Sequence, residues 1–259
     1  MIYPSIDPII FQLGPIAVRW YGLMYIAGIG LGYWLVKNKL AQLIPDKEKQ
    51  LNLITAITAG VMIGGRIGYI LIYDLSYYVK NPLKFMAIWQ GGMSFHGGAI
   101  GAAAACLILA KRYQVNTLSL LDLLGLGATV GIGLGRIGNL INGELVGRVT
   151  TVSWGMAVPG YGPFLRHPSP LYEAIGEGLI LGLTLYIVSR YISLKPGHLF
   201  SIFLGGYGLI RFGLEYFREP DTQVGYIFTS FTMGQVLCML MMVLSILTAY
   251  IIQTMGQKK

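Results

Sequence analysis

The sequence predicts an all-α polytopic membrane protein with seven transmembrane helices and a small cap on the outer side of the membrane. Apolar runs of about 17–25 residues, long enough to cross a bilayer, recur along the chain. Hydrophobic residues make up 54% of the 259 residues and charged residues only 12%, whereas a soluble domain carries about 25% charged residues. We therefore expect a single integral membrane domain over residues 1–259.

The hydropathy pattern predicts seven spans. They lie at 18–36, 52–73, 92–110, 119–141, 172–190, 198–217 and 233–252. Residues 74–91 are rich in aromatic side chains, which is typical of a segment lying at the membrane interface. Residues 142–171 form the longest outer loop, and their prolines and glycines predict a small cap of strands and turns.

The distribution of Lys and Arg predicts the orientation of the chain. One set of loops, with the C-terminal tail, holds ten basic residues, and the other set holds six: Arg19, Lys80, Lys84, Arg148, Arg166 and Arg218. The larger set consists of Lys37, Lys39, Lys47, Lys49, Lys111, Arg112, Arg190, Lys195, Lys258 and Lys259. Basic residues in short loops favour the cytoplasmic side, so we expect the N-terminus outside and the C-terminus in the cytoplasm. The net charge is +8, but the basic residues form no long run in the sequence. We therefore predict contact with anionic lipids and no nucleic-acid partner.

Glycine motifs in the spans predict helix packing. The stretch from Gly133 to Gly138 matches GxGxxG, but it lies within an apolar span rather than after a strand of a βαβ unit, so we reject dinucleotide binding. Three pairs fit GxxxG, a pattern that allows close helix–helix contact. They are Gly28/Gly32, Gly97/Gly101 and Gly131/Gly135.

The sequence predicts neither a metal site nor a cofactor. The three histidines are scattered and form no HxxxH pair on a helix, which argues against a protein zinc site. Cys106 and Cys238 each lie inside an apolar run, and we expect both to be packing residues. The first 19 residues show no cationic stretch followed by a short apolar core, so no cleaved signal peptide is expected.

Three arginines, Arg66, Arg136 and Arg211, fall inside predicted spans. Uncompensated, they would cost about 8–10 kcal/mol in total on insertion scales, comparable with a folding stability of about 5–15 kcal/mol. Each must therefore be paired, hydrated or close to the interface. Possible acidic partners are Asp122, Glu144, Glu173, Glu177 and Glu215. Glu215 lies four residues after Arg211, so the two are expected to face one another on a helix. Structural salt bridges are one interpretation. The other, for Arg136 and Arg211, is phosphate binding through the planar guanidinium, with a phospholipid headgroup as the nearest abundant phosphate.

Polar residues follow Arg136 closely. Asn139 is three residues further on, so the two share a helix face. Asn142 and Glu144 come where the helix approaches Gly143 and is expected to break. These side chains either bind a ligand or form hydrogen bonds between helices, and Glu144 either orients Arg136 or contacts substrate itself.

His96 lies in GGMSFHGGAIG, at the outer start of the third span. It is either a satisfied polar group or a general base, since histidine titrates near neutral pH. The flanking Gly97 and Gly98 carry no side chain that would cover the imidazole, which favours close approach of a substrate.

Taken together, these motifs resemble the bacterial phosphatidylglycerol–prolipoprotein diacylglyceryl transferases. The resemblance runs through nearly the whole chain in the family's order. It includes VRWYGLMY, GGRIGY, GGMSFHGG, GRIGNLINGELVGR, RHPSPLYE and YGLIRFGLEYFREPD. One departure is that only residues 149–165 separate GR from RHPS, a loop that is shorter than in some members of the family.

The resemblance implies a seven-helix enzyme of the bacterial plasma (inner) membrane, with a periplasmic cap, a periplasmic N-terminus and an active site toward the periplasm. It would transfer the diacylglyceryl group of phosphatidylglycerol to the lipobox cysteine of a prolipoprotein and release glycerol 1-phosphate, as the first step of lipoprotein maturation. The family's lipid-binding arginine falls on Arg136, with Asn139, Glu144 and Gly147 in the same signature, and we add Glu215 to the substrate-binding set. Its catalytic residues fall on Arg211, His96 and Tyr21. Which of these three assists the thiol stays open.

Two alternatives compete with a transferase of this kind. Glycine-broken spans with buried charges are also found in transporters, but we find no matching halves in the sequence. Another phospholipid-headgroup enzyme could use the same pair of arginines.

Overall fold

The structure is a computed structural model, which describes residues 3–4, 6–14, 16–87, 91–220, 226–227 and 230–255. Contacts within the chain divide it into two units. The first consists of Met1–Val36 and Asp122–Lys259, and the second of Lys37–Leu121. The expectation of one membrane domain stays a prediction. Lys258 and Lys259, which entered the charge count, lie outside the described residues.

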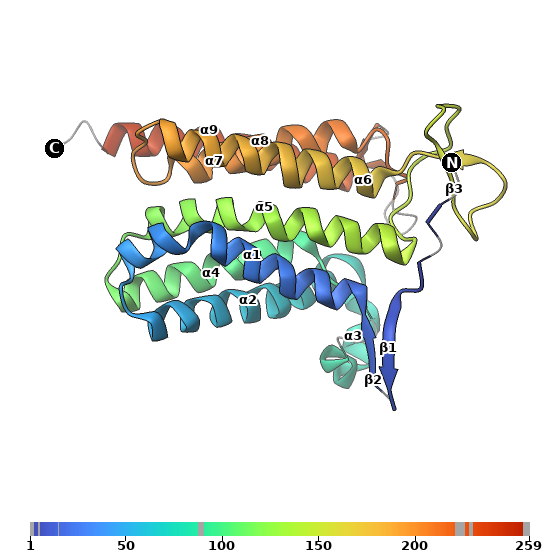
Figure 1. Ribbon diagram of the computed structural model, residues 1–259, viewed down its shortest axis with the longest axis horizontal. Coiled ribbons are helices and arrows are strands. Elements are labelled where there is room, and N and C mark those ends of the chain that lie inside the picture. Colours follow the sequence, from blue (N-terminus) through green and yellow to red (C-terminus); the bar gives the residue numbers. More distant parts are fainter. Residues whose placement is uncertain are drawn as a thin grey trace. The chain divides into compact units, whose positions relative to one another are not determined.

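A helix overlaps each predicted span, so the positions of the helices are confirmed (Figure 1). They are α1 (Trp20–Leu43), α2 (Lys47–Tyr73), α4 (Phe95–Tyr113), α5 (Thr117–Asn142), α8 (His198–Leu214), α9 (Met233–Met255) and, for the fifth span, the succession α6 (Ser169–Glu173), η3 (Ala174–Ile180) and α7 (Leu181–Tyr191). Within the described residues, four helices are long and apolar enough to cross a membrane: Lys47–Tyr73, Thr117–Asn142, Ser169–Tyr191 and Met233–Thr254. His198–Leu214 is a shorter apolar helix.

Glycines bring helices of the first unit together. A Cβ added to Gly28 of α1 would lie 2.8 Å from Cα of Gly131 in α5, and one added to Gly32 would lie 2.7 Å from the carbonyl oxygen of Gly127. This contact confirms the packing predicted for Gly28/Gly32. On α5 the second contact residue is Gly127 rather than Gly135, because an added Cβ at Gly135 would meet no atom within 4 Å. Helices α8 and α9 also pack against each other.

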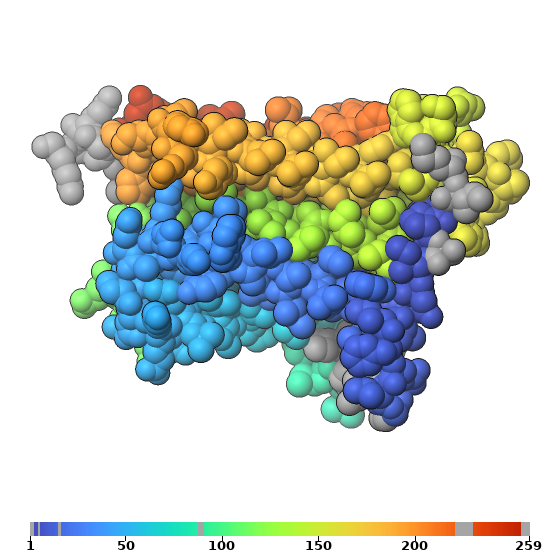
Figure 2. Space-filling view, in the orientation of Figure 1, coloured from blue at the N-terminus to red at the C-terminus, as the bar shows by residue number. Residues whose placement is uncertain are grey.

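Three short hairpins complete the first unit. Strands β1 (Ile9–Leu13) and β2 (Ile16–Arg19) pair antiparallel, and this hairpin, in dark blue, lies uncovered on the face shown in Figure 2. Its Phe11 and Leu13 side chains are exposed. In the predicted cap, β3 (Met156–Ala157) pairs with β4 (Leu165–Arg166), which confirms strands and turns there. The third hairpin joins β5 (Tyr226–Ile227) to β6 (Phe231–Thr232).

The loop after α5 has an apolar core of its own. Tyr3, Val146 and Val158 are buried together, and Leu140 and Met156 pack against them. The Tyr3 hydroxyl donates a hydrogen bond to the carbonyl oxygen of Leu140. This core fixes the start of the chain and the hairpin segment against the end of α5.

The second unit is built on α2 and α4, which pack closely along their length (Figure 1). A Cβ added to Gly64 would lie 2.3 Å from the carbonyl oxygen of Gly97, and one added to Gly101 would overlap the carbonyl group of Gly60. The GxxxG prediction at Gly97/Gly101 is therefore confirmed. The short helices α3 (Leu75–Lys80) and η1 (Pro82–Met86) follow α2.

Arg66 of α2 is 2% exposed and is held by the backbone of a neighbouring segment. Its guanidinium donates hydrogen bonds to carbonyl oxygens of the segment after α3. These acceptors are Lys84, Phe85, Ala87, Gly91 and Gly92. A guanidinium has five N–H donors, so five carbonyls can occupy its whole donor set. The structural interpretation of Arg66 therefore holds, but with backbone carbonyls in place of the salt bridges expected from the sequence.

We expect Gly64→Ala to destabilise the protein by about 1–3 kcal/mol, because the new methyl group would force α2 and α4 apart. Gly30→Ala is the matched control, since a Cβ there meets no atom within 4 Å and alanine favours a helix over glycine by about 1 kcal/mol. Thermal unfolding in detergent measures both changes. Equal unfolding temperatures for the two variants would contradict this account of the packing.

Candidate active site

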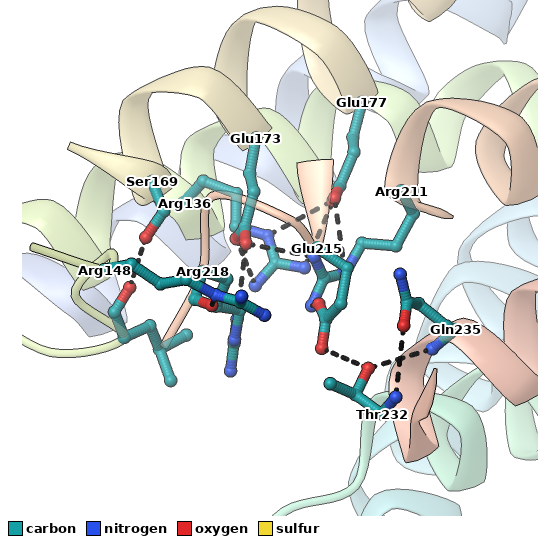
Figure 3. Close-up of polar contacts among 11 residues, drawn as sticks. Arg136, Arg148, Ser169, Glu173, Glu177, Arg211, Glu215, Arg218, Thr232 and Gln235 are labelled. Atoms are coloured by element: carbon teal, nitrogen blue, oxygen red, sulfur yellow. Dashed lines mark hydrogen bonds and ion pairs between the residues drawn. The ribbon is translucent and has the colours of Figure 1, made fainter. Parts of the chain in front are cut away.

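A cluster of six ionic side chains, none more than 13% exposed, lies in the first unit (Figure 3). Arg136 of α5 approaches Glu173 and Glu177, with nitrogen–oxygen distances of 3.0 and 3.1 Å. Arg211 of α8 contacts the same two carboxylates at 3.2 and 3.6 Å, and pairs with Glu215 one turn further along. Arg218 adds a contact of 3.4 Å to Glu173. The cluster joins three arginines to three glutamates, so its formal charge is zero.

The sequence RHPSPLYEAIGEG brings the two central carboxylates together. Pro170 lies in the first turn of α6, a position that proline tolerates. Glu173 ends α6, and Glu177 lies four residues later in η3, a π-helical segment. Residues four apart lie on the same side of a helix, and both side chains are fully buried. Short π-helical segments inside α-helices occur frequently at functional sites.

The structure provides acidic partners for two of the arginines that lie in predicted spans. Arg136 and Arg211 each contact two or more carboxylates, while their side chains stay 13% and 10% exposed. The predicted pairing of Arg211 with Glu215 is confirmed. A buried ion pair is costly to break, because the remaining charge has no partner. The arginines are therefore firmly held, yet each retains some access to its surroundings.

A second layer of hydrogen bonds orients Glu215 from the start of α9. The Thr232 hydroxyl donates to Glu215 Oε1 at 2.8 Å. The Thr232 backbone N–H donates to Gln235 Oε1, and the Gln235 N–H donates to Thr232 Oγ1. This reciprocal pair caps the helix in the manner of a capping box. Thr232 thus connects the beginning of α9 to the arginine cluster.

The signature after Arg136 folds into a tight turn at the end of α5. Gly143 and Leu145 have positive φ values of 68° and 57°, which turn the chain back toward the helix. Glu144 Oε1 accepts hydrogen bonds from the side-chain amides of Asn139 at 2.8 Å and Asn142 at 3.1 Å. Glu144 is thus held by the two asparagines, and among the described ion pairs none joins it to Arg136. Its contact with substrate stays a prediction.

Two other predicted site residues lie against this signature. The Tyr21 ring of α1 approaches Gly138 so closely that a Cβ there would lie 2.7 Å from it, and its hydroxyl lies 3.2 Å from that of Tyr25. Gly147 donates its N–H to the carbonyl oxygen of His167 and leaves no room for a side chain. The structure therefore gives Gly147 a packing role, and substrate binding by it stays a prediction.

His96 belongs to the second unit, where it is the second residue of α4. The Ser94 side chain caps this helix by accepting a hydrogen bond from the Gly97 N–H. Gly97 and Gly98 face α2. A Cβ added to Gly97 would lie 2.2 Å from the Gly64 carbonyl oxygen, and one added to Gly98 would lie 3.3 Å from the Val61 carbonyl oxygen. Helix packing thus accounts for these glycines. The role of His96 as a general base stays a prediction.

Sequence reasoning missed part of the cluster. It counted Arg218 only as a loop charge and did not single out Thr232 or Gln235. Arg218 follows Arg211 by seven residues, a spacing that places two side chains on one side of a helix, and this signal could have found it. In the described part of the chain, no group of three or more histidine, cysteine, aspartate or glutamate side chains could hold a metal ion.

These observations define a helical membrane protein with a charge-balanced arginine–glutamate cluster among its apolar helices. Residues 8–251 match the family model of prolipoprotein diacylglyceryl transferases. Relatives named phosphatidylglycerol–prolipoprotein diacylglyceryl transferase include those of Wolbachia pipientis wMel, 47% identical over 94% of both chains, and of Geobacter sulfurreducens, 46% identical over 97% of both chains. A third, from Allorhizobium ampelinum, is 46% identical over 94% of this chain and 89% of its own. The chain belongs to the prolipoprotein diacylglyceryl transferase family.

We expect Thr232→Val to lower the free energy of unfolding by about 1–3 kcal/mol, because Glu215 Oε1 loses a donor while it remains buried. Thr248→Val on the same helix is the control, since its hydroxyl bonds to the carbonyl oxygen of Leu244 in the preceding turn. Unfolding of the purified variants in detergent compares them. A loss no greater for Thr232→Val than for the control would show that the contact to Glu215 is dispensable.

Proposed function

We propose that this chain transfers the diacylglyceryl group of phosphatidylglycerol to the lipobox cysteine thiol of prolipoproteins, the first step of lipoprotein maturation. The observation that carries the proposal is the match to relatives of that name over nearly the full length of both chains. The buried arginine pair supports it independently, because guanidinium groups in a water-poor site suit a phosphate substrate.

The reaction that we propose is a direct displacement at a glyceryl carbon. The thiol loses its proton to a base, the sulfur forms a bond to the carbon, and the carbon–oxygen bond to phosphate breaks. Glycerol 1-phosphate leaves with the electron pair, and the prolipoprotein keeps a thioether. An ordinary thiol has a pKa of about 8.5, so a base raises the fraction of reactive thiolate.

Arg136 and Arg211 are assigned to the phosphate. Negative charge grows on the leaving phosphate as the carbon–oxygen bond breaks, and fixed cations in a site of low dielectric stabilise it. Asn139, Glu144, Gly147 and Glu215 complete the substrate-binding set, and Glu215 also pairs with Arg211. His96 and Tyr21 are the candidates for assisting the thiol, beside Arg211.

We further propose a bacterial inner-membrane protein with seven crossing helices, a periplasmic N-terminus and cap, and a cytoplasmic C-terminus. The helices at the seven predicted positions support this arrangement, as does the ratio of ten basic residues to six in the two sets of loops. Both substrates are membrane-bound, so we expect the lipid to enter laterally between helices.

Mixing the purified protein with phosphatidylglycerol and a lipobox peptide tests the function. We expect a diacylglyceryl-modified peptide and free glycerol phosphate, both detected by mass spectrometry. Glycerol phosphate released without peptide modification would indicate a headgroup hydrolase instead. The absence of both products from folded protein would overturn the proposal.

Arg136→Lys keeps the charge but removes the planar fork of donors, and we expect kcat/KM to fall by about 100-fold or more. Arg190→Lys is the control, because this arginine is exposed in the last turn of α7. The transfer assay measures both variants. Full activity in Arg136→Lys would rule out a specific role of its guanidinium.

His96→Ala removes the proposed base, and we expect a loss of about 100-fold or more in kcat at neutral pH. His198→Ala is the control, since the His198 ring lies near the carbonyl oxygen of Lys195 at the start of α8. If both His96→Ala and His198→Ala transfer as fast as wild type, His96 is not the base, and Tyr21 or Arg211 assists the substrate thiol instead.

A further inference from the structure

The two central carboxylates bridge the same two arginines. Glu173 places Oε2 at 3.0 Å from Arg136 and Oε1 at 3.2 Å from Arg211. Glu177 repeats this arrangement, with Oε2 at 3.1 Å from Arg136 and Oε1 at 3.6 Å from Arg211. Each carboxylate therefore gives one oxygen to each guanidinium, as the close-up of the cluster illustrates (Figure 3).

A phosphodiester can occupy the same position as either carboxylate. Both groups carry one negative charge, and both present two equivalent oxygens on one central atom. Arginine binds both through the same pair of parallel N–H donors. The place between Arg136 and Arg211 is therefore an anion site that already contains two anions from the chain itself.

The two carboxylates are not held equally. Glu173 also contacts a third arginine, Arg218, at 3.4 Å. Glu177 Oε2 accepts two hydrogen bonds from Arg136, but among the described ion pairs Glu177 contacts only Arg136 and Arg211, and its contact to Arg211 is the longest of the cluster at 3.6 Å. An incoming anion that replaces Glu177 therefore breaks ion pairs to two arginines, whereas one that replaces Glu173 breaks ion pairs to three.

We propose that Glu177 is an internal substitute for the substrate phosphate. The phosphodiester of phosphatidylglycerol replaces its carboxylate between Arg136 and Arg211, while Glu173 stays in place and keeps the arginines aligned. This inference rests on the proposed function. It makes Glu177 a positioning residue that holds the empty site together and sets the affinity for the lipid by competing with it.

The charge balance gives the direction of the effect. With Glu177 ionised, three arginines face three glutamates, and the cluster is neutral. Glu177→Gln leaves three arginines against two glutamates, a net charge of +1 that a phosphodiester neutralises. Glu177→Gln removes the charge that competes with the phosphodiester for the two guanidiniums, so we expect this variant to bind phosphatidylglycerol about tenfold more tightly or better.

The experiment titrates phosphatidylglycerol onto the full chain in nonionic detergent and measures binding by native mass spectrometry, with KM for the lipid as a second readout. We expect a lower Kd and a lower KM for Glu177→Gln. Glu173→Gln should bind the lipid more weakly, since Glu173 aligns all three arginines. Glu219→Gln makes the same change in net charge at an exposed side chain and should leave the Kd unchanged.

Unchanged or weaker lipid binding by Glu177→Gln overturns the inference, because a purely structural carboxylate would give that result. An equal gain in Glu219→Gln also overturns it, since net charge alone would then explain the effect. If Glu177→Gln does not fold, Glu177→Asp keeps the charge but withdraws it by one methylene group, and the same tighter binding is expected or the inference fails. If wild type neither binds phosphatidylglycerol nor transfers its diacylglyceryl group, the proposed function itself fails.

Discussion

The double bridge from Glu173 and Glu177 to Arg136 and Arg211 is the interaction on which the rest of the first unit depends. It joins α5, the α6–η3 segment and α8 through four ion pairs. Removing one partner of a buried ion pair costs about 3–5 kcal/mol, because the other charge remains buried alone. The same contacts therefore hold three helices in register and keep two guanidiniums available in an apolar environment.

The three arginines in the predicted spans differ in the kind of group that they contact. Arg66 is surrounded by five backbone carbonyls, which cannot leave without unfolding the segment that supplies them. Arg136 and Arg211 are held by carboxylate side chains, which can rotate away. A guanidinium paired with a movable anion can exchange that anion for a substrate, whereas one enclosed by carbonyls cannot. This difference is the reason that we assign Arg66 to the structure, and Arg136 and Arg211 to the substrate phosphate.

The sequence predicted the helices well because a membrane span leaves a strong and local signal. It also predicted the pairing of Arg211 with Glu215, which depends only on a spacing of four residues. The partners of Arg136 lie about forty residues away in the chain, at Glu173 and Glu177. No periodicity encodes which of five acidic candidates faces a given arginine, since that depends on how the helices pack.

Other details of the site depended on the folded chain in the same way. The role of Thr232 follows from the hairpin that precedes α9, and the capture of Glu144 by Asn139 and Asn142 follows from the turn at Gly143. The glycines beside His96 gave the expectation of an uncovered imidazole, and the structure uses them for contact with α2. Glycines beside a polar residue thus indicate that another group packs closely there, but the sequence does not distinguish a substrate from a neighbouring helix.

An experimental structure of the protein with bound phosphatidylglycerol tests the central claim most directly. We expect phosphate oxygens of the lipid about 2.7–3.2 Å from guanidinium nitrogens of both Arg136 and Arg211, with the Glu177 carboxylate moved away and Glu173 still in contact with both arginines. A phosphate bound elsewhere, with the four contacts between these arginines and glutamates unchanged, would contradict it.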